Sequence, residues 1–176
     1  VPTKWSITAV DDIVGRRLHK QVTRNRAIND YYVSIDQALG NTVALLFYPS
    51  GWQFEALESW LGGLNPSIIN DYEYGKGRKD YAKYVVGAYY ATRLPALEYL
   101  VSIRKQSGVI VFMEIDPQQW VPLGVWRFRE IAKRALASGV KKFQSMDEAT
   151  AEIGKHLRNP LYNWLTKSQL YNDFLS

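Results

Sequence analysis

The sequence contains 176 residues, of which 47% are apolar and 14% aromatic, so it can form the core of one ordinary domain. It has no cysteine and two histidines, which excludes disulfides, thiolate zinc sites, cysteine nucleophiles and a histidine-rich metal centre. The net charge of +5 is concentrated in residues 1–29 and 124–176, since residues 30–123 carry more acids than bases. A localised basic surface is typical of nucleic-acid contact, although ordinary solubility explains an excess of this size equally well.

The sequence contains neither a membrane-helix signal nor a signal-peptide pattern. No apolar run approaches the roughly 18 residues that a membrane helix needs, and the first residues lack the basic-then-apolar pattern of a signal peptide. We therefore expect a cytoplasmic protein with no membrane partner. The first residue is Val1 rather than methionine, which indicates that the numbering begins inside a longer protein. Carboxylates leave a Mg²⁺ site open, so the cofactor stays unknown at this point.

A helix is expected from Thr8, a suitable N-cap, because apolar residues recur at helical spacing as far as Leu18. Its C-terminal end carries a run of bases, where positive charge interacts favourably with the helix dipole. The alternative is non-specific contact with DNA phosphates, since no aromatic residue is interleaved in the run for base stacking. The expected DNA-binding residues are Arg16, Arg17, Lys20, Arg24 and Arg26, together with Lys141 and Lys142.

Apolar runs and turn-forming residues predict a mixture of strands and helices along the rest of the chain. Strands are expected at residues 31–35, 42–48 and 109–113. Helices are expected at residues 53–61, 81–106, 125–137 and 145–157, the second of them buried and bent by Pro95, and residues 62–80 form a long loop. This order predicts a single mixed α/β (α+β) domain with a central sheet flanked by helices, spanning residues 1–158 and followed by a tail at residues 159–176.

Three stretches of the chain carry a family resemblance. They are VPTKWSITAVDD at residues 1–12, GAYYATRL at residues 87–94 with EYL at residues 98–100, and Glu114 followed by PLGVWRFRE at residues 122–130. In this order they resemble the C-terminal part of the archaeal Nre proteins. The resemblance implies a role in DNA repair, the N-terminal part of the same protein as a partner, and a short terminal motif that binds the sliding clamp PCNA. It leaves any enzymatic activity undefined.

The end of the chain fits that terminal motif imperfectly. PCNA-binding peptides follow the pattern Gln-x-x-aliphatic-x-x-aromatic-aromatic and place apolar side chains in one pocket through a 3₁₀ turn. Ser168, Tyr171, Phe174 and Leu175 occupy the four defining positions, and the first two depart from the pattern. We expect these residues to bind PCNA. The alternative is an amphipathic terminal helix that packs on the core, since the apolar residues also fit helical spacing.

Arg93 and Glu114 are the candidate catalytic residues. Arg93 interrupts an apolar helix and needs a carboxylate partner, because an unpaired buried arginine costs several kcal/mol. Glu114 ends a buried strand and could be that partner, either in a structural pair or in an enzyme site. The enzyme alternatives are a nuclease with Mg²⁺ shared by Asp11, Asp12 and Glu114, or a nucleotidyl- or ADP-ribosyl-type transferase. No phosphate-binding or dinucleotide-binding glycine motif is present.

Overall fold

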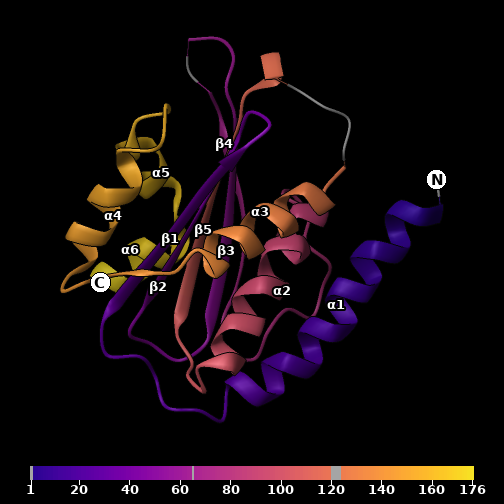
Figure 1. Cartoon of the computed structure of the whole chain (residues 1–176), viewed down its shortest axis with the longest axis vertical. Helices are drawn as coiled ribbons and strands as arrows, with labels where there is room; N and C mark the ends of the chain where they lie inside the picture. The colour runs from indigo at the N-terminus through magenta and orange to yellow at the C-terminus, as the bar shows by residue number, and fades with distance from the viewer. Residues whose placement is uncertain (1, 65, 120–123) are drawn as a thin grey trace.

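The computed structural model describes residues 2–64, 66–119 and 124–176, without the side chains of residues 2–5 and 119. The described residues form one six-stranded sheet with helices on both faces (Figure 1), which confirms the expected mixed α/β class. The strands are β1 (Tyr31–Ala38), β2 (Asn41–Tyr48), β3 (Gln53–Trp60), β4 (Ile68–Glu73), β5 (Gly108–Ile115) and β6 (Lys141–Phe143). The helices are α1 (Pro2–Val22), α2 (Gly87–Ser102), η1 (Pro117–Gln119), α3 (Trp126–Ala137), α4 (Met146–Gly154), α5 (Leu161–Lys167) and α6 (Gln169–Leu175).

The strand order is β4-β3-β5-β2-β1-β6, and every neighbouring pair is antiparallel except β3 and β5, which are parallel. The expected hairpin is confirmed: β1 and β2 pair across a turn in which Leu39 and Gly40 both have positive φ. Such a two-residue turn matches the right-handed twist of the strands. Strands β2 and β5 are buried along their whole length, because they lie at the centre of the sheet and helices cover both faces.

Helices α1, α2 and α3 lie on one face of the sheet, and α4, α5 and α6 lie on the other (Figure 1). Alternate residues of β5 divide between the two cores: Val111 packs toward α2 and α3, whereas Phe112 packs against Trp164 of α5. This division follows from the two-residue period of a strand. It also decides to which face each polar residue of the sheet belongs.

The helix expected at residues 53–61 is wrong, because these residues form β3. Glutamate, alanine and leucine favour helices, and full burial on both faces removes the polar-apolar alternation that marks a strand. Pairing with β4 and β5 overrides that local preference. The long loop expected at residues 62–80 likewise contains β4, a short strand at the edge of the sheet.

The buried helix expected at residues 81–106 begins only at Gly87 and contains Pro95 as predicted. The segment before it is held by Asp71 of β4, whose carboxylate accepts hydrogen bonds from the backbone N–H groups of Lys83, Tyr84 and Val85. The helix at the N-terminus begins before Thr8, within the first residues. Within the described part of the chain, no helix is both long and apolar enough to cross a membrane.

Candidate functional site

Arg93 and Glu114 lie on opposite faces of the sheet and do not share a site. Arg93 projects from α2 on the face that α1 and α3 also cover. Glu114 follows Phe112 by two residues on β5, so its side chain points to the face that carries α4, α5 and α6. Each of the two residues therefore has its own surroundings.

Arg93 pairs with Glu73, the last residue of β4. Arg93 Nη2 lies 2.8 Å and Nε 3.0 Å from Glu73 Oε1, and the two side chains are 5% and 2% exposed. Glu73 also accepts hydrogen bonds from Trp52 Nε1 at 2.7 Å and Tyr89 OH at 2.8 Å. The expectation that Arg93 has a carboxylate partner is met, but the partner lies on an edge strand that the sequence patterns did not reveal.

A charged pocket of about 260 Å³ lies beside this ion pair, between α1 and the segment after β4. Nη1 of Arg93 is buried and has no hydrogen-bond partner in the described part of the chain, and Gly15 of α1 leaves room for it. Burial and the charge of Arg93 lower the pKa of His19, whose ring contacts Gly75 O. The pocket is lined by Asp12, Arg16, His19, Lys20, Glu73, Lys76, Gly77, Arg78, Tyr90 and Arg93.

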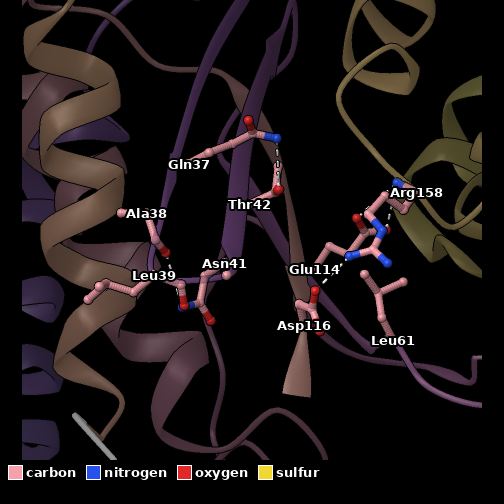
Figure 2. Close-up of a pocket in the computed structure, with 10 residues that line it drawn as sticks. Gln37, Ala38, Leu39, Asn41, Thr42, Leu61, Glu114, Asp116 and Arg158 are labelled. Atoms are coloured by element: carbon pink, nitrogen blue, oxygen red, sulfur yellow. Dashed lines mark hydrogen bonds and ion pairs between the residues drawn. The ribbon is translucent and has the colours of Figure 1, made fainter. Parts of the chain in front are cut away.

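Glu114 lies in a second pocket of about 310 Å³ at the end of the β1–β2 hairpin (Figure 2). Its carboxylate accepts hydrogen bonds from the backbone N–H groups of Arg158 at 2.8 Å and Asn159 at 2.7 Å. Asp116 pairs with Arg158 Nη1 at 2.7 Å, and the hydrogen bond from Gln118 N–H together with Arg158 lowers its pKa. Glu114 thus anchors the turn between α4 and α5 to the sheet.

The expected carboxylate group for Mg²⁺ is not assembled. Asp11 pairs with Arg129 of α3 at 2.6 Å, and burial nevertheless raises the pKa of Asp11. Asp12 pairs with Arg16 at 3.0 Å, and Glu114 lies on the other face of the sheet. Among the described residues, no group of three or more histidines and carboxylates could hold a metal ion. The side chain of Trp5 lies outside the described residues.

The expected DNA-binding residues fall into two separate groups. Arg16, Arg17 and Lys20 are exposed on α1, and Arg24 and Arg26 are exposed in the turn that follows it. Lys141 and Lys142 lie on β6, whereas the charged pocket beside α1 is built on β4, and these strands form opposite edges of the sheet. Lys141 also pairs with Glu152 at 2.7 Å. The two groups therefore lie on different elements of the fold.

The terminal segment packs against the sheet. Ser168 is fully buried, and its hydroxyl donates to Glu55 at 2.5 Å, while the N–H groups of Gln169 and Leu170 donate to the same carboxylate. Burial raises the pKa of Glu55 despite these donors. Tyr171 is partly buried. Phe174 contacts the rings of Tyr48 and Tyr31, yet 39% of it is exposed, as is 61% of Leu175.

Comparisons with known proteins match nearly the whole chain. Residues 73–176 match the family described as "Archaeal Nre, C-terminal", and residues 1–64 match "Archaeal Nre, N-terminal". The chain is 33% identical over 176 residues to DNA repair protein NreB of Archaeoglobus fulgidus, covering 97% of this chain and 45% of that protein. It is 33% identical to NreA of the same organism, covering 96% and 44%, and 30% identical to NreA of Haloferax volcanii, covering 97% and 42%. No solved structure matches the chain.

The chain thus spans less than half the length of these curated relatives. It contains matches to both parts of the family, and the C-terminal match alone covers more than half of its residues. The resemblance to the family is confirmed, but residues 1–64, which contain the first of the three stretches, match the N-terminal description and not the C-terminal part that was expected. This chain belongs to the archaeal Nre family.

Proposed function

We propose that this chain is part of a DNA-repair protein and that it contacts DNA phosphates through the basic end of α1. The curated relatives are DNA repair proteins by name. The observation that carries the proposal is a group of exposed cations, Arg17, Lys20, Arg24 and Arg26, which form no ion pair with any residue that the structure describes. Unpaired guanidinium and ammonium groups are available to neutralise phosphates and release their counterions.

A titration of duplex DNA at increasing salt tests this contact. Each phosphate contact contributes about 0.9 to the slope of log K against log salt for duplex DNA, so Arg17→Gln with Arg24→Gln should lower the slope by about 1.8. The matched control is Lys141→Gln with Lys142→Gln on the opposite edge of the sheet, which should leave the slope of the wild type. Equal slopes for the wild type and the α1 variant would exclude the proposed contact.

The tail supports a second proposal, recruitment to the PCNA sliding clamp. Phe174 and Leu175 are 39% and 61% exposed in α6, in positions that fit the last two residues of the clamp-binding pattern. Binding requires Tyr171 and Phe174 to leave their contacts with the sheet, because the clamp pocket must receive the same side chains. Calorimetric titration of PCNA with a peptide of residues 164–176 should release heat, and Phe174→Ala should abolish it. A wild-type peptide that gives no heat would refute this docking.

The alternative of a nucleotide-processing enzyme required Arg93 and Glu114 to share one site, and they do not. Arg93 and Glu114 cannot act together on one substrate, because the sheet separates them. Glu114 is occupied by two backbone N–H groups. A site near Arg93 would have to use the residues of the α1 pocket instead.

A further inference from the structure

Three pockets meet at Arg78, in the segment between β4 and α2. Their volumes are about 560, 390 and 260 Å³, and each is lined in part by Arg78. The guanidinium of Arg78 donates to Tyr72 O at 2.8 Å and Asp80 O at 3.1 Å, and it lies 3.5 Å from the carboxylate of Asp71. These contacts hold the segment against the edge strand of the sheet. The three pockets therefore lie next to one another along the edge of the sheet, and we call them together the Arg78 surface.

Exposed tyrosine rings border this surface. Tyr72 is 37%, Tyr74 48% and Tyr84 67% exposed. The rings of Tyr72 and Tyr74 lie 5.6 Å apart, and both residues line the largest pocket. Tyr72 and Tyr84 line the next pocket from two different segments of the chain. Exposed rings of this kind offer π-faces on which a nucleobase can stack.

The charges around these rings favour an anion. Three carboxylates on the surface are neutralised by arginine: Asp12 by Arg16, Asp71 by Arg78 and Glu73 by Arg93. Two further acids lie there: Asp80 lines two of the pockets, and Asp173 of α6 accepts a hydrogen bond from Tyr74 OH at 2.8 Å. Four lysines outnumber these two acids. These lysines form no ion pair with any residue in the described part of the chain, and they are Lys20, Lys76, Lys79 and Lys83.

We infer that the Arg78 surface binds single-stranded nucleic acid, with bases stacked on Tyr72, Tyr74 and Tyr84 and phosphates beside the four lysines. Aromatic rings interleaved with lysines are the pattern that such proteins use, and residues 72–84 carry this interleaving in their own sequence. In a duplex the bases stack on one another and present no free face to tyrosine. The inference rests on the proposed DNA contact and extends it, since Lys20 of α1 borders the same surface.

Tyr84→Ala is the most direct test, because the ring is 67% exposed and its removal leaves the backbone hydrogen bond to Asp71 intact. Fluorescence anisotropy of the full chain with a labelled single strand of about 12 nucleotides should show binding about tenfold weaker for the variant. Tyr84→Phe should bind like the wild type, since the ring and not the hydroxyl stacks. The control Tyr162→Ala removes a ring that is 75% exposed on α5, and it should have no effect.

Two further measurements complete the test: binding of a duplex of the same length, and binding of the single strand by a variant that lacks two of the lysines. Duplex binding should be unchanged by Tyr84→Ala, and Lys79→Ala with Lys83→Ala should lower the salt slope for the single strand by about 1.4. Duplex binding with no preference for single strands, or single-strand binding unaffected by Tyr84→Ala, would overturn the stacking surface alone. A chain that binds neither form contradicts both this surface and the proposed DNA contact.

Discussion

Replacement of Arg93 by methionine should lower the free energy of unfolding by about 3 kcal/mol, the lower end of the range for breaking a buried ion pair. Glu73 would stay 2% exposed without its cation, but it would keep the hydrogen bonds from Trp52 and Tyr89. The change also removes Nη1, a buried donor that has no partner among the described residues. Both effects limit the cost, which is why the lower end of the range applies.

Urea unfolding followed by circular dichroism measures this free energy for the wild type, Arg93→Met, Glu73→Gln and the double variant. In the double variant neither partner is left as an uncompensated charge, so its loss should be smaller than the sum of the two single losses by about 1–3 kcal/mol. An Arg93→Met protein within about 0.5 kcal/mol of the wild type, or strictly additive losses, would refute the reasoning.

Three further predictions concern packing, pH and the tail. Gly108→Ala should destabilise the fold by about 1–3 kcal/mol or more in thermal unfolding, because a Cβ there would meet the ring of Tyr48. Lys141 and Lys155 lower the pKa of Glu152 to about 2, so the contribution of Glu152 to stability is present above about pH 4.5 and is lost as the pH falls toward 2. When unfolding midpoints are measured over this pH range, Glu152→Gln should show a weaker dependence on pH than the wild type. Glu55→Gln replaces one of the two oxygens that accept from the N–H groups at the start of α6 by an NH₂ donor, so hydrogen exchange should show faster amide exchange there. Unchanged protection would contradict this anchoring role.

Part of the fold follows from local sequence. Strands β2 and β5 are predictable because their β-branched and apolar runs have few alternatives. The helix expected from residue 145 is α4, and Ser145 is its N-cap, whose side chain accepts a hydrogen bond from Glu148 N–H. Strand β3 is not predictable in this way, since its glutamates and alanine favour a helix and only pairing within the sheet makes it a strand. Strand β4 is short and lies between glycine-containing segments, which hides it among loop signals.

The candidate site could be predicted from the sequence only in part. The need of Arg93 for a carboxylate is a property of one residue, and physical chemistry predicts it without a structure. The identity of the partner depends on which face of the sheet α2 covers. Glu73 lies on that face and pairs with Arg93, whereas the side chain of Glu114 points to the opposite face.

Helices α4, α5 and α6 come from the last thirty or so residues, yet Trp164 and Leu170 complete the core on their face of the sheet. During synthesis on the ribosome the strands are made before these helices. The apolar side chains on the face of the sheet that α4, α5 and α6 cover are therefore exposed until these helices have formed. Ile110 and Phe112 are among the side chains left open in this interval. This face of the sheet can therefore be covered only after residues 146–175 have been synthesised.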